Sequence, residues 1–169
     1  SMKLAKNLER LGTESAFSIL AEAKKLEAAG KEMIHLGLGQ PDFKSPKHVV
    51  EAAKKAIDDG HHGYVLANGI LECREAVSRK IKSLYKKDIN PERVMIMPGG
   101  KPTMYFAISM IGEPGSEIIH PTPGFPIYES MINYTGATAV PYDLTEDKDL
   151  KFDPEKILSL ITDKTRLCL

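Results

Sequence analysis

The 169-residue sequence has no tryptophan and only two cysteines, Cys73 and Cys168. Two isolated cysteines do not make a disulfide framework, and a reducing, cytoplasmic setting fits them. No apolar run approaches the roughly 20 residues that a membrane-spanning helix needs. Lysine plus arginine and aspartate plus glutamate each number 23, so the formal net charge is zero. We therefore expect neither nucleic acid nor an anionic membrane as a partner.

The second half of the sequence alternates between short apolar runs and amphipathic stretches. It predicts strands at 93–97, 117–120, 138–142 and 165–169, and helices at 102–111, at 127–134 and from the Asp153-Pro154 pair onward. Hydrophobic residues make up 42% of the chain, which is enough to form a core. Strand–helix alternation at this spacing predicts an α/β fold, in which a mostly parallel sheet is covered by helices.

The first half is predicted to be mainly helical. It begins with an irregular arm at 3–13, and a short extended run covers 33–38. Helices are expected at 15–29, from Ser45-Pro46 to Gly60, and at 70–85. Ser45 is the expected N-cap and Pro46 the first helical residue of the second of these, while Gly30 and Gly60 are expected to end the first two.

The run Val94 to Thr103 has the pattern of an anion site. An apolar segment leads into Gly99, Gly100 and Lys101, and a helix pattern follows directly. Glycine backbone lets N–H groups approach a phosphate, and the helix start adds a positive end. A helix start with an exposed lysine explains the same pattern. It is not a Walker A loop, because Met95 stands where that motif needs glycine.

Three further segments suggest ligand contacts, each with an ordinary structural alternative. Phe125, in a proline-rich turn after the 117–120 strand, is either a stacking platform for a flat ring or a core residue under a turn. The loop from Gly37 to Phe43 either holds a carboxylate with its N–H groups or is a plain turn. Tyr64 is either a phosphate donor or a surface residue. We expect no metal site at His61-His62, because further ligands at suitable spacing are missing.

In this order, the segments resemble the amino-terminal part of the class I/II (fold-type I) pyridoxal-phosphate aminotransferases, and most of all the aspartate-aminotransferase-like branch. The resemblance covers Leu8 to Leu169. Its anchors are Gly37-Leu38-Gly39-Gln40-Pro41-Asp42-Phe43, His62-Gly63-Tyr64, Gly69-Ile70-Leu71-Glu72-Cys73-Arg74-Glu75-Ala76, Gly99-Gly100-Lys101 and Pro123-Gly124-Phe125-Pro126-Ile127-Tyr128.

The resemblance implies a role for each candidate residue. Gly99, Gly100 and Lys101 would hold the phosphate of pyridoxal 5'-phosphate, and Phe125 would stack on its pyridine ring. Tyr64 would reach the phosphate in the partner subunit, which implies a homodimer with shared sites. Gly39 would offer its backbone N–H to the substrate carboxylate.

The resemblance also implies an organisation. Residues 1–45 would form an arm and a segment of the small domain. Residues 46–169 would form an incomplete large domain that binds the cofactor. The apolar strand pattern that ends at Leu169 leads us to expect a longer protein.

The implied activity is amino transfer between an amino acid, aspartate or a similar one, and a 2-oxo acid in the cytoplasm. Two departures from the family pattern limit it. Many aspartate-specific members carry tryptophan where this chain has Phe125, and the Schiff-base lysine of the family is not among these residues. We therefore expect the 169 residues alone to be inactive and assign them no catalytic residue. Other chemistry on the same scaffold, such as a β-lyase or decarboxylase, and a non-catalytic phosphate-binding module remain alternatives.

Overall fold

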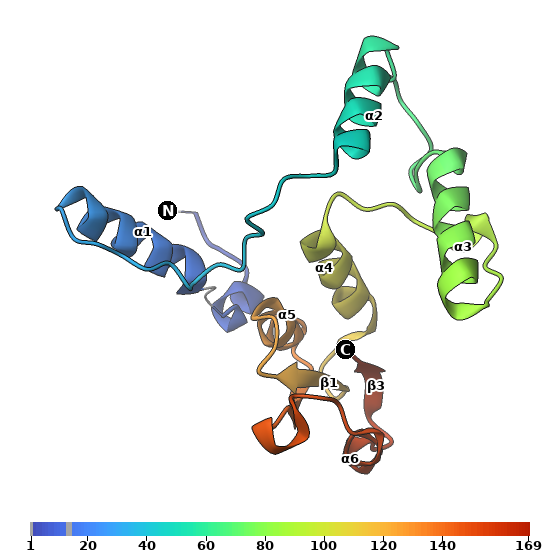
Figure 1. Ribbon diagram of the computed structural model, residues 1–169. Coiled ribbons are helices and arrows are strands. Elements are labelled where there is room, and N and C mark those ends of the chain that lie inside the picture. The colour runs from blue at the N-terminus through green and yellow to red at the C-terminus, as the bar shows by residue number, and fades with distance from the viewer. Residues whose placement is uncertain (1, 13–14) are drawn as a thin grey trace. The chain divides into compact units, whose positions relative to one another are not determined.

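The computed structural model describes residues 2–12 and 15–169 and divides them into two compact units. The first unit combines the chain up to Leu38 with Gly99–Leu169, and the second contains Gly39–Pro98 (Figure 1). The predicted division at residue 45 stays a prediction. Among the described residues, no helix is both long enough and apolar enough to cross a membrane.

The first unit contains a parallel sheet that, within the described residues, has three strands in the order β2-β1-β3. The strands are β1 (Glu117–Thr122), β2 (Thr138–Asp143) and β3 (Thr165–Cys168). Ile118 of the central strand pairs with Ala139 on one side and Leu167 on the other. The predicted parallel α/β arrangement is confirmed, and these strands begin where the sequence places them.

Helices cover both faces of this sheet, which explains the continuous burial along β1. The helices α4 (Gly100–Ile111) and α5 (Ile127–Thr135) pack against each other, and in Figure 1 they lie above the strands, with α6 (Pro154–Leu160) below. Ile118 and Ile119 point to opposite faces and are both buried. The core cluster consists of Ile108, Ile118, Met131, Ile132 and Ala137.

The remaining elements are mostly helical. The first unit begins with η1 (Lys6–Arg10) and α1 (Ser15–Ala28), and residue 13 of the predicted arm lies outside the described residues. The second unit contains α2 (Lys47–Asp58), α3 (Leu71–Tyr85) and the short η2 (Pro91–Arg93). Gly30 and Gly60 follow α1 and α2 with φ of 84° and 79°, so their predicted role in ending the helices is confirmed.

Two local predictions are wrong. Residues 93–97, predicted to be a strand, do not form one, because their backbone is not hydrogen-bonded in a ladder to a neighbouring described strand. The N–H of Ile96 instead donates to the carbonyl of Asn68, at 3.1 Å. The helix α2 begins at Lys47 rather than Pro46. Pro46 occupies the N-cap position, with no side-chain cap, so Ser45 does not cap the helix.

The predicted start of α6 at Asp153 is confirmed, and it carries a pH-dependent contact. The Asp153 carboxylate accepts from the N–H of Glu155 at 3.1 Å and from Lys148 Nζ at 2.5 Å. The hydrogen bond from Lys148 is the main cause that lowers the pKa of Asp153, and it also raises the pKa of Lys148. A carboxyl whose pKa is lower when folded adds stability above its ordinary pKa of about 3.9 and loses it as the pH falls.

We expect Asp153→Asn to lower the melting temperature at neutral pH, because asparagine keeps the cap oxygen but loses the ion pair. The effect should be small, a few degrees at most, because the pair is exposed. Thermal unfolding of both proteins across the acid range tests this. The difference should shrink as the pH falls from about 3.9 through the lowered pKa of Asp153, because the carboxylate of the folded wild type is protonated only there. A difference that is independent of pH would show that the ion pair contributes nothing.

Candidate functional site

The turn Gly99–Lys101 forms the start of α4, two residues earlier than the sequence predicts. Gly99 is the N-cap residue and has φ of 103°, in the region that favours glycine. The Thr103 hydroxyl donates to the Gly99 carbonyl at 3.1 Å and holds the turn closed. Because first-turn N–H groups point out of a helix end, this turn presents the amides of Gly100 and Lys101 to a ligand.

The space above this turn is open. A Cβ built on Gly100 would meet no other atom within 4 Å, so packing leaves room for a side chain at this position. Open space beside N–H groups at the positive end of a helix suits an anion. Among the described residues there is no cluster of three or more His, Cys, Asp or Glu side chains suited to a metal ion.

Phe125 lies beside Lys101 in the same unit. The Lys101 ammonium nitrogen is 5.8 Å from the centre of the Phe125 ring. Phe125 is 38% exposed as a residue, so the alternative that it fills the core is wrong. Phe125 follows the carboxyl end of β1, the usual edge for ligand sites in parallel sheets. The structure thus brings together two of the predicted contact residues, a cation on a helix start and a partly exposed aromatic residue.

Two residues that the sequence did not assign hold Phe125 in place. Tyr128, in the first turn of α5, packs edge-on against the ring, with centroids 5.8 Å apart and planes at 86°. Gly124 lies so close to the Pro121 carbonyl that a Cβ there would come within 2.3 Å of the oxygen. Both residues belong to the sequence motif around Phe125. Their contacts could not be predicted from it, because they depend on how the turn folds back on itself.

Gly39 and Tyr64 belong to the second unit. A Cβ on Gly39 would meet nothing within 4 Å, so its backbone is accessible. The Tyr64 side chain is fully exposed and lies in a loop that borders a cavity of about 700 Å³, lined by Ala56, Gly60, His61, Gly63, Tyr64, Val65, Ile70 and Glu72. Both residues are available for a ligand, and their predicted roles stay predictions.

The model for aminotransferase class I and II matches residues 31–168, which is most of the chain. The chain belongs to the class I and II aminotransferases. It is 32% identical over 165 residues to an aspartate aminotransferase of Bacillus subtilis (strain 168), covering 98% of this chain and 42% of that protein. It is 36% identical over 163 residues to a (5-formylfuran-3-yl)methyl phosphate transaminase of Methanocaldococcus jannaschii, covering 96% of this chain and 42% of that protein.

Solved aminotransferase structures have the same fold. An aspartate aminotransferase from Thermus thermophilus with maleate superposes with a TM-score of 0.90 at 28% identity, covering 99% of this chain and 44% of that one. An alanine aminotransferase from Pyrococcus furiosus gives a TM-score of 0.89 at 29% identity. The predicted family and the partial fold-type I domain are confirmed. This aminotransferase chain spans less than half the length of the relatives it matches.

Proposed function

We propose that the protein transfers an amino group between an amino acid, aspartate or a similar one, and a 2-oxo acid, with pyridoxal 5'-phosphate as cofactor. The observation that carries the proposal is the pairing of the α4 start with the Phe125 ring, 5.8 Å from Lys101 Nζ. This pairing supplies one site for an anion and one for a flat ring. Membership of the class I and II aminotransferases supports the same cofactor and reaction.

The residues at this pairing fit pyridoxal phosphate. The amides of Gly100 and Lys101 and the Lys101 ammonium would bind the phosphate, and the φ of Gly99 sets the direction of this turn. Phe125 would cover one face of the ring and keep water from it. When bound, the cofactor supplies the electron sink that amino transfer requires. These chain residues hold and orient it.

Other parts of the proposal concern the whole protein. Gly39 would donate its N–H to the substrate carboxylate. Tyr64 would contact the phosphate held by a second subunit, so the protein would work as a homodimer. We place it in the cytoplasm, in amino-acid biosynthesis. The chain covers 42% of the length of the Bacillus subtilis aspartate aminotransferase. The family resemblance places the lysine that links the cofactor elsewhere in the whole protein, so we expect the 169 residues alone not to catalyse.

An assay of the whole protein with aspartate or alanine as donor and 2-oxoglutarate as acceptor tests this proposal. We expect glutamate to form only when pyridoxal phosphate is present. The 169-residue chain should give no turnover under the same conditions. Release of ammonia or carbon dioxide without glutamate would instead indicate lyase or decarboxylase chemistry. If the 169-residue chain gave turnover, and Lys101→Ala in that chain abolished it, the proposal that the chain alone is inactive would be overturned.

A further inference from the structure

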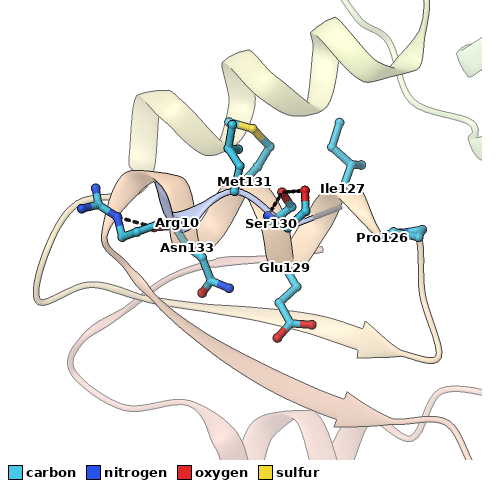
Figure 2. A pocket seen from close by; sticks show the side chains of 9 residues that line it. Arg10, Pro126, Ile127, Glu129, Ser130, Met131 and Asn133 are labelled. Carbon is cyan, nitrogen blue, oxygen red and sulfur yellow. Dashed lines mark hydrogen bonds between the residues drawn. The ribbon is translucent and has the colours of Figure 1, made fainter. Parts of the chain in front are cut away.

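The arm before α1 lies along the helix α5, although 118 to 124 residues separate the bonded pairs. Arg10 Nε donates to the Asn133 carbonyl at 2.9 Å, and Arg10 Nη2 donates to the Tyr134 carbonyl at 2.8 Å. Two residues on, the N–H of Gly12 donates to Ser130 Oγ at 2.9 Å. Figure 2 shows Arg10, Ser130 and Asn133 along this contact. The arm thus runs from the carboxyl end of α5 toward its beginning.

Arg10 completes the carboxyl cap of α5. The last carbonyls of a helix lack partners within it, and a helix of nine residues depends on contacts from outside. The Thr135 hydroxyl donates to the Ile132 carbonyl at 2.7 Å, and the Gly136 N–H donates to Asn133 at 3.0 Å. The forked guanidinium of Arg10 adds a donor to Asn133 and supplies one to Tyr134. Its charge also suits the negative end of the helix.

The other end of α5 carries the aromatic of the candidate site. Pro126 is the N-cap residue, so Phe125 directly precedes the helix. The N–H of Tyr128 donates to the Phe125 carbonyl at 3.0 Å, and the Tyr128 ring packs against the Phe125 ring. Both the backbone and the ring of Phe125 are therefore attached to the first turn of α5. A shift or fraying of α5 would move Phe125 with it.

The contact between arm and helix is polar rather than tightly packed. A cavity of about 560 Å³ lies between them, lined by Arg10, Leu11, Gly12, Pro126, Ile127, Glu129, Ser130, Met131 and Asn133 (Figure 2). Arg10 is itself exposed. Leu8 and Leu11 of the arm are 40% and 41% exposed. The directed bonds of Arg10 and Gly12 fix the position of the arm along α5.

We propose that Arg10 is a positioning residue, which latches the arm onto the end of α5 and thereby holds Phe125 in place against the cofactor ring. That Phe125 lies against the cofactor ring rests on the proposed function. That Arg10 positions Phe125 is independent of it, because the contacts involved all lie within one unit. Phosphate binding at the α4 start should not depend on Arg10, since that turn is held by Gly99 and Thr103.

The test compares Arg10→Ala, Arg10→Lys and the wild type in the whole protein. Arg79→Ala is the matched control, because Arg79 is an exposed arginine of α3 paired at 3.8 Å with Glu75. The protein is labelled with 4-fluorophenylalanine, and the signal that disappears in Phe125→Leu is assigned to Phe125. Fluorine NMR reports the position of Phe125 without any cofactor. Titrations with pyridoxal phosphate and with inorganic phosphate then separate ring binding from phosphate binding.

We expect Arg10→Ala to shift or broaden the Phe125 signal and to weaken pyridoxal phosphate binding roughly two- to tenfold. Inorganic phosphate binding should stay unchanged. Arg10→Lys should rescue part of the effect, because lysine keeps the charge but not the fork. Arg79→Ala should match the wild type.

An unchanged Phe125 signal in Arg10→Ala would overturn the proposal, even if the melting temperature fell, because Arg10 would then be only a helix cap. Equal weakening of pyridoxal phosphate and inorganic phosphate binding would overturn it too. If the wild type bound no pyridoxal phosphate, the proposed function would fail. The fluorine signal would still support or overturn the latch.

Discussion

Replacing Lys101 with methionine is expected to raise the Kd of pyridoxal phosphate roughly 10- to 100-fold and to leave the melting temperature nearly unchanged. Hydrogen bonds to charged groups contribute about 1.5–3 kcal/mol, and each 1.4 kcal/mol is a factor of about ten in affinity. Methionine has an unbranched apolar side chain of similar length but no ammonium group to bind a phosphate. A spectroscopic titration of the whole protein with the cofactor measures the change.

The matched control is Lys31→Met, an exposed lysine of the same unit that follows α1. It removes the same charge from the protein and should leave the Kd unchanged. If both variants weaken binding equally, the effect is one of net charge. In that case, Lys101 would not contact the phosphate.

Gly124→Ala is expected to destabilise the first unit by about 1–3 kcal/mol and to weaken cofactor binding as well. The added Cβ would come within 2.3 Å of the Pro121 carbonyl oxygen and 3.2 Å of its carbon. Backbone atoms cannot rotate away as a flexible side chain can, so the turn itself must move. Phe125 is the next residue and must move with it. Urea unfolding gives the loss of stability, and the same titration gives the loss of affinity.

Gly63→Ala is the control for this substitution, because a Cβ at Gly63 would meet nothing within 4 Å. We expect its stability to stay within about 0.5 kcal/mol of the wild type. If Gly124→Ala were as stable as Gly63→Ala, the close approach to Pro121 would not exist in solution.

The sequence predicted the elements whose formation depends on local pattern. The strands β1, β2 and β3 have apolar runs between clear turns, and the turn residues at Gly30, Gly60 and Asp153 act where they were expected to. The run at 93–97 has the same apolar pattern, but a strand also needs a neighbouring backbone to pair with. Local sequence carries no information about that neighbour.

In the candidate site, too, local motifs could be predicted from the sequence and contacts between distant or folded-back segments could not. Lys101 and Phe125 stand in motifs that the sequence displays, and the structure places them 5.8 Å apart. The contacts of Gly124 with Pro121 and of Arg10 with α5 could not be predicted in this way. The first depends on the course of a tight turn, and the second joins residues more than 120 positions apart. Arg10 stands out in the sequence only as one charged residue among several in the arm.

A crystal structure of the whole protein with pyridoxal phosphate tests the central claim most directly. We predict the phosphate within hydrogen-bond distance of the amides of Gly100 and Lys101, and the pyridine ring stacked on Phe125. A phosphate bound away from the start of α4, or a ring that does not contact Phe125, would contradict the account.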